Sequence, residues 1–150
     1  ASPEATFLPY PTLFRSPAWV KKITVHVIGA VGQAGAGEGY LRIGDAGGIE
    51  ATGYICIYDE SSVQSTATTS FFMHTGYAAT SNIHGIYVLT LEDSTNKTWC
   101  CNGQGGDYGI GPSRTSTTGY KSLSATLTQL TLSISASTWT AGSASIIYEG

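Results

Sequence analysis

A glycine-rich stretch in the second half of the chain carries the side chains best suited to bind a ligand. Aromatic faces stack on sugar rings, and amides and carboxylates bond sugar hydroxyls, much as adaptable binding surfaces use Tyr, Ser, Gly and Asn. Residues 102–120 show no clear period, and long loops of this kind are commonly functional or mobile. We therefore expect a loop that contacts a glycan or receptor, although aromatic residues in small β proteins more often belong to the core. The contact residues that we expect are Asn102, Gln104, Asp107, Tyr108 and Tyr120.

The histidines give no sign of a metal site. His26, His74 and His84 fall on three separate expected strands or strand ends, without the close spacings that gather ligands around a metal ion. We expect them to be solvated or hydrogen-bonded, and we expect neither a metal nor another cofactor.

The cysteines do not form a disulfide framework, because their number, three, is odd. Cys100 and Cys101 are adjacent, so in a strand they would point to opposite faces. We expect Cys56 and one of this pair to pack as small apolar residues.

Motifs for catalysis are equally weak. Serine is abundant, and Ser, His and an acid could converge into a triad, because such sites are defined by geometry rather than sequence order. However, there is no GxSxG motif, and the carboxylate pairs Asp59-Glu60 and Glu92-Asp93 fit turns. The glycines of residues 29–39 precede an expected strand rather than a helix, which argues against nucleotide binding. We expect no enzyme activity.

Composition excludes several classes of protein. The 150 residues suffice for one domain with a full core. Only 11% of them are charged, against roughly 25% in typical soluble proteins. The net charge of −3, with basic residues scattered, argues against nucleic-acid binding. No apolar run approaches the roughly 20 residues of a membrane helix, so we expect a soluble protein with a hydroxyl-rich surface and no membrane insertion.

Short alternating segments predict an all-β fold, namely an antiparallel, jelly-roll-like β-sandwich of about eight strands. Residues 60–69 are expected to form a loop. Residues 130–150 are expected to form a closing hairpin with its turn at Ala141-Gly142. The clearest apolar faces hold Ile23, Val25 and Val27 in one segment, and Tyr87, Leu89 and Leu91 in another.

The first 18 residues hold four of the five prolines, which disfavours both helix interiors and central strands. We expect residues 1–18 to form an extended anchoring arm and residues 19–150 to form a single sandwich domain. The arm is too apolar for a free tail, so it should lie against the domain or a neighbouring subunit. Its apolar residues are Phe7, Leu8, Tyr10, Leu13 and Phe14.

Three stretches carry a family resemblance. Residues 17–25 read PAWVKKITV, residues 44–54 read GDAGGIEATGY, and residues 139–149 read WTAGSASIIYE. Together they resemble a family of bacteriophage virion proteins, found as distal domains of tail fibres and as small structural proteins. Members of that family share the patterns IPxWxKRITV, GDxGGIExTGY and xFxAGSxxILYE. Residues 60–125 match the family only loosely.

The resemblance implies a β-sandwich that works in the virion, often as a homotrimer, and it transfers no catalytic residues. We expect a non-enzymatic virion structural protein, made in the host cytoplasm: a trimeric tail-fibre or receptor-binding domain. One alternative is a capsid decoration or head-fibre protein that stabilises the shell. Another is a polysaccharide depolymerase, which would need two carboxylates about 5 to 9.5 Å apart in a groove. The expected partners are further copies of the chain, other virion proteins and a host surface glycan.

Overall fold

The computed structural model describes residues 4–6, 12–32, 37–75, 79–109, 112–135 and 138–150. In these residues the chain is all-β, as expected, and it forms thirteen strands rather than about eight. None of the described segments is a helix long and apolar enough to cross a bilayer. The strands are β1 Glu4–Thr6, β2 Thr12–Arg15, β3 Lys22–Gly32, β4 Glu38–Asp45, β5 Gly48–Ile49, β6 Tyr54–Glu60, β7 Val63–Ala67, β8 Phe71–Thr75, β9 Ile83–Asp93, β10 Thr98–Asp107, β11 Ser113–Ser122, β12 Gln129–Ile134 and β13 Trp139–Glu149.

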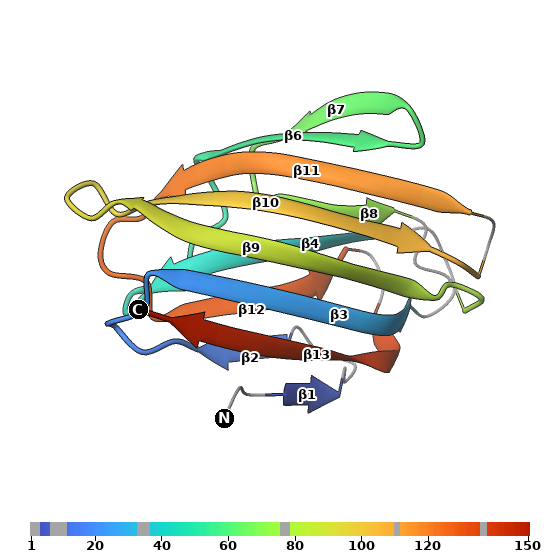
Figure 1. Cartoon of the computed structure of the whole chain (residues 1–150), viewed down its shortest axis with the longest axis horizontal. Coiled ribbons are helices and arrows are strands. Elements are labelled where there is room, and N and C mark those ends of the chain that lie inside the picture. Colours follow the sequence, from blue (N-terminus) through green and yellow to red (C-terminus); the bar gives the residue numbers. More distant parts are fainter. Residues whose placement is uncertain (1–3, 7–11, 33–36, 76–78, 110–111, 136–137) are drawn as a thin grey trace.

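The strands form two antiparallel sheets that stack face to face (Figure 1). The larger sheet has the order β1-β13-β3-β9-β10-β11-β6-β7. The smaller has the order β2-β12-β4, and both β5 and β8 pair with β4. From β3 onward the chain passes repeatedly from one sheet to the other, for example from β3 to β4 and from β11 to β12. The expected antiparallel β-sandwich is therefore confirmed.

One apolar core fills the space between the sheets. On β3, the side chains of Ile23, Val25 and Val27 face inward and are at most 1% exposed. Tyr87 and Leu89 are buried in the same way on β9, and Leu91 is partly buried against the same core, so the alternation expected for both segments is confirmed. Each fully buried side chain of this size contributes roughly 1.5–3 kcal/mol through the hydrophobic effect.

Residues 102–120, which were expected to be a loop, form most of the antiparallel pair β10 and β11. The ring of Tyr87 explains the glycines of this segment. A Cβ atom at Gly103 would lie 2.2 Å from Cδ1 of that ring, and one at Gly105 would lie 2.6 Å from its hydroxyl oxygen. Because no side chain fits there, β10 presents bare backbone to the ring. This half of the strand thus lacks the apolar residues that mark the first half, where Trp99 and Cys101 are buried.

The prediction of a closing hairpin is also wrong. β12 and β13 belong to different sheets, and Ala141 and Gly142 lie inside β13, where its register against β3 shifts. Gly142 has a φ of 109°, and a Cβ atom there would lie 2.6 Å from the Cα atom of the buried Ala30. The glycine is therefore needed for a bulge, which has the same local sequence signature as a turn.

Two other segments expected to lie outside the strands pair with sheet edges. Residues 63–67 form β7, which pairs with β6. The N-terminal segment supplies one edge strand to each sheet, because β1 pairs with β13 and β2 pairs with β12. Proline is tolerated next to edge strands, so its abundance here does not prevent pairing.

The residues expected to anchor the arm differ in their surroundings. Phe14 is 5% exposed and belongs to the core of its own domain, whereas Leu13 is 46% exposed. Phe14 is thus held by the sandwich itself and is not free to anchor a neighbour. Phe7, Leu8 and Tyr10 lie outside the described residues.

The contact between Tyr87 and Gly103 can be tested by a double-mutant cycle. We expect Gly103→Ala to lower the free energy of unfolding by about 1–3 kcal/mol, because overpacking a core has that cost. In a Tyr87→Leu background the same change should cost less, because the ring that the new methyl group meets is gone. Urea denaturation of the four proteins measures this coupling. Strictly additive losses would show that the ring does not impose the glycine.

Candidate functional site

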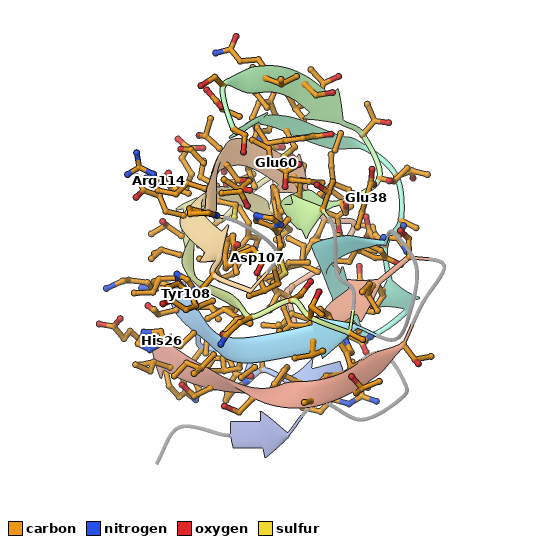
Figure 2. The ribbon with its side chains drawn as sticks, turned by 90° about the vertical axis from the view of Figure 1, so that its right-hand side faces the viewer. His26, Glu38, Glu60, Asp107, Tyr108 and Arg114 are labelled. Atoms are coloured by element: carbon orange, nitrogen blue, oxygen red, sulfur yellow. The ribbon has the colours of Figure 1, made fainter. Side chains whose placement is uncertain are left out.

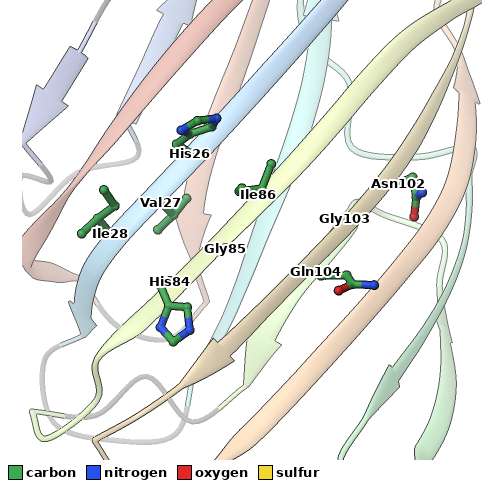
Figure 3. Close-up of a pocket in the computed structure, with 9 residues that line it drawn as sticks. All are labelled: His26, Val27, Ile28, His84, Gly85, Ile86, Asn102, Gly103 and Gln104. Atoms are coloured by element: carbon green, nitrogen blue, oxygen red, sulfur yellow. The ribbon is translucent and has the colours of Figure 1, made fainter.

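A groove crosses the outer face of the larger sheet, on strands β3, β9 and β10 (Figure 3). We call it the outer groove, and it encloses about 590 Å³. Its lining combines exposed isoleucines with imidazole and amide groups and contains no carboxylate, lysine or arginine. The side chains that line it are His26, Ile28, His84, Ile86, Asn102 and Gln104, and Val27, Gly85 and Gly103 complete it.

The pairing of the strands places these side chains together. On the outward face, Ile86 of β9 is the direct neighbour of His26 on β3 and of Gln104 on β10. Gly29 has a φ of 64° and lies where the register between β3 and β9 shifts. Ile28 alternates with the buried Val27 and is therefore outward and 66% exposed, and the irregularity at Gly29 then brings Ala30 to the inner face.

A second groove continues from the first toward the ends of β6, β10 and β11. We call it the rim groove; it encloses about 700 Å³ and shares His84 and Gln104 with the outer groove. Unlike the outer groove it contains charged side chains, which lie near its aromatic residue. Its lining includes Asp59, Asp107, Tyr108, Ser113, Arg114 and Ser116.

The structure brings together four of the five residues singled out in the sequence. Asn102 and Gln104 line the outer groove, and Gln104, Asp107 and Tyr108 line the rim groove. Tyr108 is 81% exposed. Figure 2 shows Tyr108 on the same side of the molecule as His26, with Asp107 further in. The amides offer both donors and acceptors, and the phenol ring offers a face for stacking, as a sugar ligand requires.

Asp107 has a different role from the one expected. It is 5% exposed, and its Oδ1 atom accepts N–H bonds from Asn82 at 2.9 Å and from Gly109 at 2.8 Å. The neighbouring Tyr108 N–H donates to the carbonyl of Asn82 at 3.2 Å. Asp107 therefore fixes the backbone on both sides of Tyr108, and its Oδ1 atom is already occupied by backbone donors.

Tyr120 lines neither groove. It lies on β11 directly opposite Ile55 of β6, and Ile57 is two residues further along that strand. The three are 48%, 50% and 51% exposed, respectively, on the outer face of the sheet. We call them the isoleucine patch. An exposed apolar cluster of this kind is typical of an interaction surface.

Sequence reasoning missed the histidines of the outer groove. The signal was present for His26, because it alternates with the buried Ile23, Val25 and Val27 and must therefore point outward. The signal was weaker for His84, because its place in the same groove as His26 depends on how β9 runs relative to β3, and only the fold determines that. Among the described residues, no group of three or more His, Cys, Asp or Glu side chains could hold a metal ion.

The GDAGGIEATGY segment builds a polar cluster away from the two grooves. We call it the Glu50 cluster, and it comprises Asp45, Glu50, Lys121 and Ser124. The Ser124 hydroxyl lies 2.6 Å from Asp45 Oδ2 and 2.7 Å from Glu50 Oε1. Lys121 Nζ, which is nearly buried, donates to Glu50 Oε2 at 2.5 Å. These contacts join the end of β4 to the end of β11, so the segment has a structural role.

Hydrogen bonds in the Glu50 cluster stabilise the ionised carboxylates. The hydrogen bond from Ser124, together with that from the Gly47 N–H, lowers the pKa of Asp45. Burial alone would raise the pKa of Glu50, but the hydrogen bonds from Lys121 and Ser124 outweigh it, so this pKa is also lowered.

Acid should therefore weaken the fold through this cluster. Because both pKa values are lowered on folding, the native state binds fewer protons, and the contribution is lost as the pH falls below 4.5 and 3.8, the ordinary values for Glu50 and Asp45. We expect Glu50→Gln to reduce stability at pH 7 and to flatten its decline toward pH 3, as measured by urea denaturation. The exposed Glu92→Gln is the control and should keep the wild-type slope. An unchanged slope in Glu50→Gln would contradict this assignment.

Comparison with models of protein families, with curated proteins and with solved structures found no match to this chain.

Proposed function

We propose that this chain is a structural domain of a bacteriophage virion and that it binds a glycan on the host surface through the outer and rim grooves. The observation that carries the glycan-binding part is the convergence of Asn102, Gln104 and Tyr108 along two adjoining grooves. The virion part rests on the sequence resemblance of residues 17–25, 44–54 and 139–149.

The chemistry of the outer groove supports a neutral, hydroxyl-rich ligand. The outer groove contains amides, imidazoles and isoleucine side chains, and its lining has no carboxylate, lysine or arginine. Charged partners such as nucleic acids are bound by clustered basic residues, whereas sugars pair hydroxyl groups with amides and apolar ring faces with apolar or aromatic side chains. The two adjoining grooves, of about 590 and 700 Å³, together have room for more than one sugar unit.

We further propose that the chain assembles as a homotrimer through the isoleucine patch. Ile55, Ile57 and Tyr120 are each about half exposed, and covering them would bury apolar surface at roughly 25 cal/mol per Å². The patch lies on β6 and β11, whereas the outer groove lies on β3, β9 and β10. Both surfaces lie on the same face, and Thr118 of β11 separates Ile57 from Asn102, so a trimer contact that leaves the groove accessible must end at β11. The N-terminal segment, with its exposed Leu13, would attach the trimer to other virion proteins.

Capsid decoration is the alternative role for the same fold. A decoration protein would use its apolar surface to bind the shell, and it would require no glycan in the grooves. Immunogold labelling over the tail would support the receptor-binding role, whereas labelling over the head, with binding to expanded capsids, would support decoration.

We expect the double variant Asn102→Ala/Gln104→Ala and the single variant Tyr108→Ala each to reduce glycan binding by about 10-fold or more, since each lost hydrogen bond or stacking contact is worth about 1–3 kcal/mol. An array of bacterial surface polysaccharides, probed with the purified protein, measures the binding. Gln64→Ala is the matched control, because Gln64 is an exposed amide on β7 that lines neither groove. Equal binding by all variants, or no binding by the wild type, would contradict the proposed site.

Light scattering tests the trimer. At micromolar concentration we expect a mass three times that of the 15.7 kDa chain. Ile57→Lys should reduce it to the monomer mass, because a lysine in the patch would have to be desolvated without a partner. Ile28→Lys is the control: it places the same charge on the same face, outside the patch, and should leave the trimer intact. A wild-type monomer would refute the assembly without bearing on the glycan site.

A further inference from the structure

Three side chains form a chain of hydrogen bonds at the end of the sandwich next to the rim groove. We call it the Ser113 relay. The Ser113 hydroxyl oxygen lies 3.0 Å from Nε2 of His74, and Nδ1 of His74 lies 3.2 Å from Oε1 of Glu60. The residues come from β11, β8 and β6, so the relay joins both sheets. Serine, histidine and acid in this order have the geometry of a nucleophile, its base and the group that orients the base.

We propose that Ser113 is an activated nucleophile that accepts the acyl group of a short-chain ester. Serine is a weak nucleophile on its own, and it becomes reactive when a neighbouring base can take its proton. His74 is placed to act as that base, and Glu60 is a positioning residue that holds the imidazole.

The contacts of His74 determine which ring nitrogen carries the proton. Nδ1 faces the Glu60 carboxylate and also the backbone carbonyl of Thr75, and both of these groups can only accept hydrogen bonds. Nδ1 must therefore be the protonated nitrogen of the neutral ring. In the neutral ring with this tautomer Nε2 carries the lone pair, as a general base requires, and it lies 3.0 Å from the Ser113 hydroxyl oxygen.

Glu60 is itself held in place. Its Oε1 atom accepts the N–H of Thr75 at 2.9 Å and lies 3.5 Å from the Thr115 hydroxyl, and its Oε2 atom accepts the Thr75 hydroxyl. These donors stabilise the carboxylate in one orientation. The side chain of His74 is only 4% exposed, so its ring is also restrained by its surroundings. Such restraint keeps the base aligned with the serine.

Ser113 is the accessible member of the relay. It is partly exposed and lines the rim groove, whereas His74 lies behind it in the interior. The Ser113 side chain shares the inner face of β11 with the buried Thr115 and Thr117, so an ester would reach it from the open end of the sandwich, beside the rim groove. Because Ser113 is only partly exposed, the acyl group must be short, as in an acetyl ester.

The step balances without a further reactant. The Ser113 oxygen forms a bond to the ester carbonyl carbon, and its proton passes to His74 Nε2. The bond from that carbon to the leaving alcohol oxygen then breaks, and the alcohol takes the proton from His74. The acyl group remains on Ser113 until water repeats the sequence and releases a carboxylic acid. An O-acetylated sugar as donor would rest on the proposed glycan binding, but the reactivity of Ser113 does not.

A fluorophosphonate probe and p-nitrophenyl acetate test the proposal on the purified full chain. We expect one probe adduct per chain by intact mass, mapped by peptide analysis to Ser113, and an acetyl adduct at the same residue with the ester. His74→Gln should slow labelling by about 100-fold or more, the usual contribution of a general base. Glu60→Gln should slow it less, because it removes only the orienting group.

The matched control is Ser122→Ala, because Ser122 is an exposed serine on the same strand that lines neither groove. This variant should label at the wild-type rate, and Ser113→Ala should not label. Circular dichroism would confirm that each variant is folded. A folded wild-type protein that gives no adduct, or an adduct that persists in Ser113→Ala, would overturn the proposal. Either result would leave the glycan-array test unaffected.

Discussion

The packing of one tyrosine ring against glycine backbone determines the form of the larger sheet. The ring of Tyr87 occupies the space that side chains would take at Gly85, Gly103 and Gly105. Because the glycines of β10 must face inward, Asn102 and Gln104, which alternate with them, must face outward. The spacing of the amides in the outer groove is thus a consequence of how the core is filled. The packing of the glycines against Tyr87 in the core and the outward placement of the two amides therefore have the same cause.

The sequence predicted those parts of the fold whose signal is local. The alternation of Ile23, Val25 and Val27 identified a half-buried strand, and the structure confirms it. The second half of β10, from Asn102 onward, was missed because its inward residues include Gly103 and Gly105, and the tyrosine that replaces their side chains lies on another strand. The bulge at Gly142 was taken for a turn because only its close contact with Ala30 separates the two. The candidate site was likewise predicted only where its signal is local. The residue types of Asn102 and Gln104 identified them as contact residues. The structural role of Asp107 could not be predicted, because its Oδ1 atom accepts a hydrogen bond from Asn82, which is 25 residues away.

Two polar clusters lie near opposite ends of the core. The Glu50 cluster uses Lys121 near the end of β11, whereas the Ser113 relay begins at the first residue of that strand. Both connect residues of the two sheets. No strand covers the ends of an open sandwich, so polar groups there can reach water. Placing polar groups at these ends therefore costs less free energy than placing them in the middle of the core. The same position places the relay beside the rim groove, at the border of the apolar centre.

The pairing of β1 and β2 has a consequence for the solution behaviour of the protein. A single segment near the N-terminus covers one border of each sheet, and an uncovered border is a row of free N–H and C=O groups that can recruit a strand from another molecule. Displacing this segment would therefore expose β12 and β13 at once and invite strand exchange between chains. By covering both edges, the segment protects the protein against polymerisation. A partner that bound this segment in place of the sheets would have to supply replacement strands to both of them.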